Sequence, residues 1–227
     1  MARTLNPAAH ALRRDEFIDA TQRLMLAKGF DQISVQELLS ELGTSKGAFY
    51  HYFDSKSALL EAVVDRMGDA ALATLRPMLD DPSIPAPVKL AGVFSGIARW
   101  KNARRDLMLK ILEVWLSDDN AIVREKFRRG LAARLVPVLA PVVEQGVAEG
   151  HFHTDSPRHT ARVFVALLMG MNEAATLLYM ARRAGEVEFE EVRQTLGAYY
   201  DAFSLMLGAP PGTLERLDES TLHLWFD

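Results

Sequence analysis

Between positions 34 and 56 the sequence gathers the side chains that proteins use to hold a nucleic-acid backbone and touch base edges. A lysine ammonium and small hydroxyl groups suit phosphate oxygens, a tyrosine can donate to phosphate or touch a thymine methyl, and a glycine lets backbone approach closely. The candidate DNA-contacting residues are Ser34, Thr44, Ser45, Lys46, Gly47, Tyr50, His51 and Lys56. This combination favours double-stranded DNA as the partner.

Two short helices must position these residues. Ser34 is a suitable N-cap and Glu37 follows three positions later, which predicts a capping box in which the glutamate also reaches back to the serine amide. Apolar residues then recur at steps of three and four from Val35 to Leu42, as on one face of a helix. Gly43 comes next and can adopt the positive φ that a sharp helix end requires.

The second helix is expected over about Ser45 to Phe53, capped by Thr44 or Ser45. Its free amides and dipole would attract a phosphate. In a helix-turn-helix, this second helix enters the major groove while the first crosses the backbone. A helix pair with a glycine turn also occurs in other all-α proteins, so the pair by itself leaves an ordinary structural role open. In either case Ala48, Phe49 and Phe53 are expected to pack inward, leaving Lys46, Gly47, Tyr50 and His51 outward.

The run from Gly43 to Leu60 resembles the signature of the TetR family of bacterial repressors, which is roughly Gly-Val-Ser-Lys-Gly-Thr-Leu-Tyr-His-His-Phe-x-Ser-Lys-x-x-Leu. Thr44 stands where valine is common, Phe49 where leucine is common, and Tyr52 where histidine or tyrosine occurs. The similarity covers about residues 10–60. It implies a three-helix DNA-binding domain, about nine helices in all, and a C-terminal domain for ligand binding and dimerisation.

Composition excludes several other classes. The 227 residues are 49% hydrophobic and contain no cysteine, which rules out disulfides and thiolate metal sites and fits a cytoplasmic protein. The sequence contains no uninterrupted run of eighteen apolar residues, so no membrane span is predicted. Residues 1–10 lack the apolar core of a signal peptide. No phosphate-binding glycine loop, nucleophile elbow or zinc-protease motif points to an enzyme or a cofactor.

Charge gives no general electrostatic attraction for DNA. The formal net charge is -4, and residues 1–57 carry seven basic and seven acidic side chains. DNA binding would therefore depend on local sorting of charge, with Lys46, Lys56, His51 and either Arg13 or Arg14 on one face. Few phosphates would be neutralised, so we expect weak non-specific binding and a modest salt dependence.

The remaining chain reads as helices throughout, so the predicted class is all-α. Residues 1–55 are expected to form the helix-turn-helix domain and residues 56–227 the ligand-binding and dimerisation domain. A long helix over residues 55–79 would connect them. Pro137 and Pro141 lie inside another long apolar segment and predict a kink or break near residues 135–140. The tail ending in Trp225 and Phe226 is expected to dock onto the body or onto a partner subunit.

Two late helices carry apolar stripes that could form a dimer interface, because two helices from each protomer make a four-helix bundle. The stripes could equally be ordinary core. The candidate interface residues are Val163, Leu167, Gly170, Ala174, Leu196, Tyr199 and Phe203. A single recognition helix reads few bases, so a homodimer that reads two half-sites is favoured, and the TetR resemblance implies the same.

Large apolar side chains in the body helices could line a pocket for a small, largely apolar effector whose identity the sequence does not specify. Glu113 and Asn172 interrupt apolar helices and, if buried, would need polar partners; Glu113 would then favour a cationic ligand. A core role, or exposure to water, is the alternative for each. The candidate pocket residues are Phe94, Met108, Leu112, Glu113, Trp115, Leu168 and Asn172.

The sequence therefore predicts a repressor that binds a palindromic operator as a dimer and is released by its ligand. A DNA-binding regulator controlled by another protein, or a helical carrier or enzyme, is the alternative. The group His151, His153, Asp155 and His159 matches no specific metal signature, so no metal site is predicted.

Overall fold

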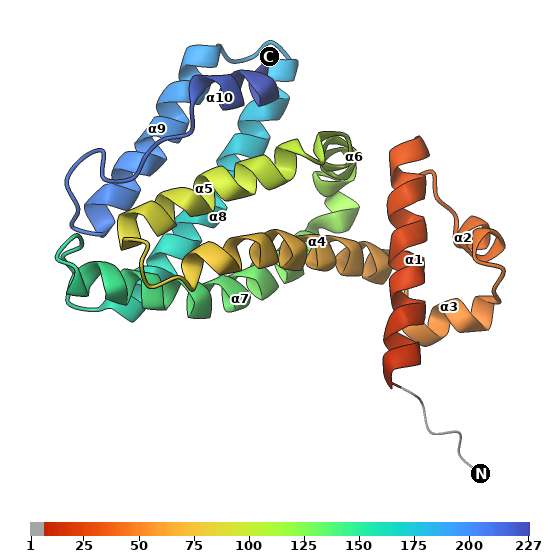
Figure 1. The fold of residues 1–227 in the computed structure, drawn as a ribbon. Helices are drawn as coiled ribbons and strands as arrows, with labels where there is room; N and C mark the ends of the chain where they lie inside the picture. The colour runs from red at the N-terminus through yellow and green to blue at the C-terminus, as the bar shows by residue number, and fades with distance from the viewer. Residues whose placement is uncertain (1–6) are drawn as a thin grey trace. The chain divides into compact units, whose positions relative to one another are not determined.

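The structure, a computed structural model, describes residues 7–227 and is helical, with no β-strand in that range (Figure 1). The all-α prediction is confirmed. Arg3, one of the basic residues counted above, lies outside the described residues. The elements are α1 Pro7–Lys28, α2 Val35–Glu41, α3 Lys46–Tyr52, α4 Lys56–Leu79, α5 Ala86–Asn102, α6 Arg105–Trp115, the 3-10 turn η1 Asp118–Asn120, α7 Ala121–Ala148, α8 Pro157–Arg183, α9 Phe189–Met206 and α10 Glu219–Phe226.

Two local features differ from the expectation. The tail forms a tenth helix, α10, because Asp218 caps it by accepting a hydrogen bond from the Thr221 amide at 2.7 Å. In addition, α7 continues as an α-helix through Pro137 and Pro141, so of the kink or break predicted there the break does not occur, and the kink stays a prediction. The surrounding apolar residues of α7, which belong to the core, offset the hydrogen bonds that the two prolines cannot make.

The chain divides into two compact units. Unit 1 comprises Met1–Ala70 and Ala103–Phe127, and unit 2 comprises Ala71–Asn102 and Arg128–Asp227. In unit 1, α1 packs against α2 and α6, which explains why α6 groups with the N-terminal helices. Helix α4 supplies residues to both units. A separately folding DNA-binding domain that ends near residue 55 stays a prediction.

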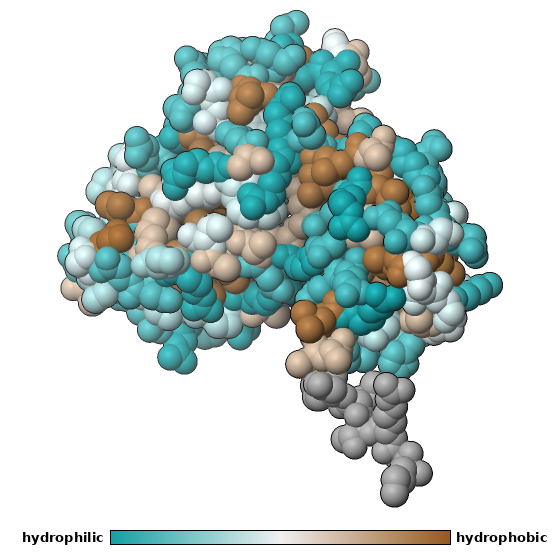
Figure 2. All heavy atoms as spheres, turned by 45° about the vertical axis from the view of Figure 1, so that its right-hand side comes forward, coloured by the Kyte–Doolittle hydropathy of each residue, from teal (hydrophilic) through white to brown (hydrophobic). Residues whose placement is uncertain are grey.

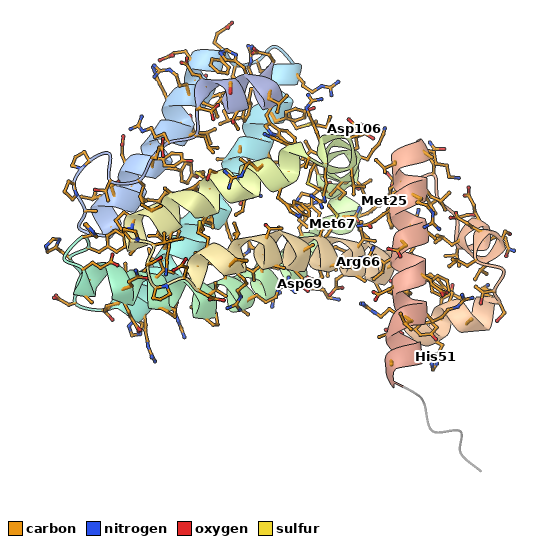
Figure 3. All side chains as sticks on the ribbon, viewed as in Figure 1. Met25, His51, Arg66, Met67, Asp69 and Asp106 are labelled. Carbon is orange, nitrogen blue, oxygen red and sulfur yellow. The ribbon has the colours of Figure 1, made fainter. Side chains whose placement is uncertain are left out.

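An aromatic cluster forms the centre of the N-terminal helices in unit 1. The ring of Phe17 on α1 lies 5.7 Å from that of Phe49 on α3 and 5.9 Å from that of Phe53, and the first two side chains are fully buried. Helix α4 is tied to α1 by Arg66, which donates to Asp19 Oδ1 at 2.7 Å and to Gln22 Oε1 at 2.7 Å (Figure 3). The ring contacts of Phe17 with Phe49 and Phe53 therefore fix the short helix α3 on α1.

Unit 2 has its own core, in which α8 and α9 pack along each other. Its centre is a second aromatic group: the Phe164 and Phe203 rings lie 4.6 Å apart, and Phe94 from α5 lies 5.0 Å from Phe203. Helix α10 packs on α8 and α9 of the same chain and buries Phe226. The Trp225 indole also donates to Asn102 Oδ1 at the end of α5.

Two segments, residues 118–148 and α8, are long and apolar enough by composition to cross a membrane. Long core helices of globular proteins pass the same test, and both segments place apolar side chains in the core of unit 2. Over the face drawn in Figure 2, apolar residues form small groups separated by hydrophilic surface. Only 33% and 22% of their most apolar windows are buried, however, so packing within the chain covers part of their apolar surface and leaves the rest exposed.

Candidate nucleic-acid interface

The turn between α2 and α3 forms as the sequence predicts. Ser34 caps α2 by accepting the Glu37 amide at 3.1 Å, and Leu38 and Leu39 are buried. Gly43 has φ +56, the left-handed conformation that glycine adopts most easily. Thr44, half-buried in the turn, donates its backbone amide to Leu39 O at 2.9 Å. Thr44 and Ser34 thus both hold the turn together.

The second half of the predicted capping box is wrong. The Glu37 carboxylate does not reach back to Ser34 but pairs with Lys28 at the end of α1. The hydrogen bond from Lys28 is the main reason that the pKa of Glu37 is lowered. A tertiary ion pair has replaced the local one, and it joins α1 to α2.

Helix α3 presents one polar face to solvent. Ser45 caps it by accepting the Ala48 amide at 3.2 Å, while Phe49 is fully buried on the opposite side. Tyr50 is 49% exposed. The outward residues of this surface, termed the α3 face below, are Lys46, Gly47, Tyr50 and His51.

Aromatic contacts restrict the side chains of the α3 face. The Lys46 ammonium lies 5.9 Å from the Tyr50 ring centroid, a cation–π distance. The His51 ring, beside the lower part of α1 in Figure 3, lies 5.3 Å from that of His10 on α1 and 5.0 Å from that of Tyr52. His10 therefore borders the α3 face. Sequence reasoning missed it because no local spacing links α1 to α3.

Lys56 lies differently from the expectation. Its ammonium donates to the Asp31 carbonyl at 3.1 Å and lies 4.5 Å from the Phe30 ring centroid, so it holds the loop between α1 and α2. Burial lowers the pKa of Lys56, the charge of Asp31 acts in the opposite direction, and Lys28 lowers the pKa further. We therefore group Lys56 with the residues that support the helix-turn-helix.

The two arginines considered for the same face also have internal contacts. Arg13 pairs with Glu16 and reaches the Leu42 carbonyl at 3.4 Å. The Arg14 guanidinium lies 5.4 Å from the Phe53 ring centroid and is exposed. Of these two, Arg14 is the one whose charge has no carboxylate partner among the described residues.

Comparison with known proteins identifies this arrangement. A family model described as "Bacterial regulatory proteins, tetR family" matches residues 17–63, which run from α1 into α4. Over residues 17–63 the chain belongs to the tetR family.

Individual relatives agree with this assignment. A helix-turn-helix transcriptional regulator of Lactococcus lactis is 33% identical over 82 residues, which cover 30% of this chain and 42% of that protein. The regulator BetI of Cronobacter sakazakii is 26% identical over 156 residues, covering 67% of this chain and 71% of BetI. The chain spans about two fifths of the length of the first curated relatives that it matches.

A solved tetR-type regulator from Haloarcula marismortui has a TM-score of 0.59 at 22% identity, covering 85% of this chain and 98% of that one, which shows the shared fold. These relatives are transcription regulators, not enzymes, in agreement with the lack of catalytic motifs.

The predicted pocket residues are divided between the two units. Phe94 and Leu168 are buried in the core of unit 2. Trp115 packs edge-on against Phe127 within unit 1, with ring centroids 5.4 Å apart. Met108 and Leu112 are half-buried on α6, which also belongs to unit 1.

Both polar interruptions of the body helices are exposed. Burial and exposure were both open for Glu113 from the sequence, and the structure shows exposure: its side chain is 61% exposed and pairs with Lys110 at 3.2 Å. The buried carboxylate that would favour a cationic ligand is therefore absent at this position. Asn172 is also exposed, and its Oδ1 accepts a hydrogen bond from Lys101.

The residues proposed for a dimer interface fall into two groups. Val163 is 56% exposed, and Leu167, Gly170, Ala174 and Tyr199 are half-buried. Leu196 is only 7% exposed and Phe203 is fully buried, so these two are core residues of the same chain and a correction to the prediction. One face of α8 and one face of α9 pack into the core of the same chain. The apolar stripes predicted from the sequence combined residues of this buried face with residues of the exposed face.

The histidine group after α7 has ordinary partners. His153 Nδ1 lies 3.1 Å from the Gly208 carbonyl, and His159 Nδ1 lies 2.5 Å from Ser156 Oγ. Within residues 7–227, no three histidine or acidic side chains gather as they would around a metal ion.

Proposed function

We propose that this tetR-family regulator represses transcription in the cytoplasm by binding a palindromic DNA operator as a homodimer, and that a small, largely apolar ligand releases it. The observation that carries the proposal is the α3 face. Lys46, Tyr50 and His51 are presented to solvent by a helix whose opposite side is locked by the buried Phe49. A fixed helix with an exposed polar face suits insertion into a major groove.

Each residue of the α3 face has a defined role in this proposal. Lys46 neutralises a phosphate, and Tyr50 donates to phosphate or touches a thymine methyl. A Cβ on Gly47 would meet nothing nearer than Ser45 Oγ at 3.9 Å, so the space beside it is open to a sugar-phosphate backbone. His51 and the neighbouring His10 extend the contact along the backbone.

Dimerisation is supported by apolar side chains that unit 2 leaves in solvent on α8 and α9. Val163 and Leu177 are each 56% exposed, Met180 is 44% exposed and Leu205 is 82% exposed. Burial of these four side chains against a partner subunit would remove apolar surface from water, which supports an interface on α8 and α9. A two-fold dimer would place its α3 helices in successive major grooves, about 34–36 Å apart.

Release from DNA by a ligand requires a helix that moves when the ligand binds in the C-terminal domain and that is also attached to the helix-turn-helix. Helix α4 starts four residues after α3 ends, and Arg66 ties it to Asp15 and Asp19 of α1. A ligand that shifts α4 would therefore move α1 and α3 with it. The ligand must bind the released conformation more tightly than the DNA-bound one, since otherwise the equilibrium does not change.

The test is titration of DNA from upstream of the protein's own gene, followed by fluorescence anisotropy at several salt concentrations. Lys46→Ala is expected to weaken binding about 3- to 30-fold and to reduce the salt slope by about two, one for each protomer. Tyr50→Phe should weaken binding without changing the slope. Lys126→Ala is the control, because this exposed lysine pairs with Glu61 on α4 and is not on α3. Unchanged affinity in both α3 variants would refute the proposed DNA face.

A further inference from the structure

A lysine and an asparagine meet in unit 2 without a countercharge. Lys101, near the end of α5, donates from its ammonium to Asn172 Oδ1 on α8 at 2.5 Å. The partner is a neutral amide. The Asn172 side-chain NH₂ donates to no described residue, and its backbone carbonyl already accepts from Thr176. Two donor groups, one of them charged, thus lie side by side.

The ammonium is enclosed by protein and still partly accessible. Burial lowers the pKa of Lys101 to about 8, and no charged group of the described residues adds to or opposes this effect. The side chain nevertheless keeps part of its surface accessible. A partly buried ammonium whose hydrogen-bond partner is a neutral amide would be stabilised by an anion placed beside it.

The surroundings of the pair are apolar. Ile97 lies one helical turn before Lys101 on α5, and Leu168 lies one turn before Asn172 on α8; both belong to the core of unit 2 or pack against it. Met171, next to Asn172, also packs against that core. A polar pair at the rim of an apolar wall matches a ligand with one polar end and an apolar body.

The local sequence is basic in an acidic protein. The parts of the stretch 99–134 that belong to unit 2, residues 99–102 and 128–134, contain five arginine and lysine residues and no aspartate or glutamate, whereas the whole chain has a net charge of -4. Several of these basic residues have partners within the protein. Their excess still makes this stretch more attractive to anions than to cations.

We propose that Lys101 and Asn172 bind the carboxylate of an amphipathic effector whose hydrocarbon part lies along the apolar residues of α5 and α8. One carboxylate oxygen would accept from the Lys101 ammonium and the other from the Asn172 amide, as in charge-assisted pairs elsewhere. The inference rests on the proposed ligand response and specifies the class of ligand. It replaces the cationic ligand that Glu113 suggested with an anionic one.

The experiment compares three probes that share one hydrocarbon chain and differ in charge: octanoate, 1-octanol and octyltrimethylammonium. Binding to the full chain without DNA is measured by calorimetry and by fluorescence of Trp100, the neighbour of Lys101. Octanoate is expected to bind roughly tenfold more tightly than octanol or better, because a hydrogen bond to a charged group is worth that much. The cation should bind most weakly.

Variants distinguish binding of the carboxylate by Lys101 from nonspecific hydrophobic binding of the hydrocarbon chain. Lys101→Met should remove the preference for octanoate and leave octanol affinity unchanged, while Lys126→Met should change neither. Raising the pH from 7 to 10 should weaken octanoate binding in the wild type, since the ammonium is lost, but not in Lys101→Arg, whose guanidinium stays charged.

Equal affinity for the three probes, tighter binding of the cation, or no binding of octanoate would overturn the proposal. An octanoate preference that survives Lys101→Met would also overturn it. A DNA titration of the same preparation separates this failure from failure of the proposed function: retained operator binding with no charge preference refutes the carboxylate site alone.

Discussion

Lys56 and Lys46 carry the same charge in the same helix-turn-helix, yet the structure gives them different surroundings. Lys46 is exposed on the α3 face, whereas Lys56 is held by the Asp31 carbonyl and the Phe30 ring. Replacing each by methionine keeps the hydrocarbon stem and removes only the ammonium. The matched pair therefore separates support of the fold from contact with DNA.

The expected loss of stability for Lys56→Met follows from its two contacts. A hydrogen bond from a charged donor is worth about 1.5–3 kcal/mol, and a cation–π contact adds about 0.5–1 kcal/mol at an exposed site. The variant regains the desolvation free energy that lowers the pKa of Lys56, and solvent screens part of the rest. We expect a net loss of about 1–2 kcal/mol, which lowers Tm by about 2–8 °C in a chain of this size.

Thermal unfolding by circular dichroism at fixed protein concentration measures this loss of stability. DNA titration at several salt concentrations measures the contribution of each lysine to phosphate contact. Lys56→Met should lower Tm and leave the salt slope unchanged. Lys46→Met should leave Tm within about 1 °C, since surface substitutions change stability little, and should reduce the slope by about two. If Lys56→Met reduces the slope as Lys46→Met does and leaves Tm unchanged, Lys56 is a phosphate contact and the clamp assigned to it is wrong.

Three further predictions concern the fold. Gly43→Ala should destabilise the protein by about 1 kcal/mol, because Gly43 has φ +56; the check is a urea titration, and an unchanged midpoint would argue against this turn geometry. Gly146→Ala should cost about 1–3 kcal/mol, because a Cβ there overlaps the buried Phe152 ring; a double variant with Phe152→Leu should recover part of the loss, and full additivity would contradict the overlap. Hydrogen bonds from Ser220 and Thr221 lower the pKa of Asp218, so its stabilisation of α10 is complete above pH 3.8 and is lost as pH falls through the lowered pKa. Trp225 fluorescence should report that loss in the wild type and not in Asp218→Asn.

Local signals were the most predictable part of the chain. The caps at Ser34 and Ser45 and the positive φ of Gly43 all follow from interactions within four residues. The outward set on α3 follows from helical period once Phe49 is known to face inward. These features require no knowledge of the rest of the fold, so sequence reasoning could reach them.

Contacts between distant residues were not predictable in the same way. Periodicity shows that a helix has an apolar stripe, but it does not show which neighbour covers the stripe. Phe203 fills the protomer's own core while Val163 remains in solvent, although both fit the same kind of pattern. The exposure of Glu113 could not be decided from sequence for a related reason: a polar residue in an apolar helix is buried or exposed according to the packing of that helix.

The ion pairs show how the charges of the first 57 residues, which sum to zero, are arranged in the structure. Arg13, Arg23 and Lys28 each pair with a glutamate, so these charges cancel locally and contribute little to the field at the α3 face. Lys56 is engaged by a carbonyl. Among the described residues 7–57, Arg14 and Lys46 remain, which makes about four cations per dimer that can neutralise phosphates, and the logarithmic salt slope should then be about −3 to −4. A much steeper slope would mean that DNA binding breaks these internal pairs and recruits their cations.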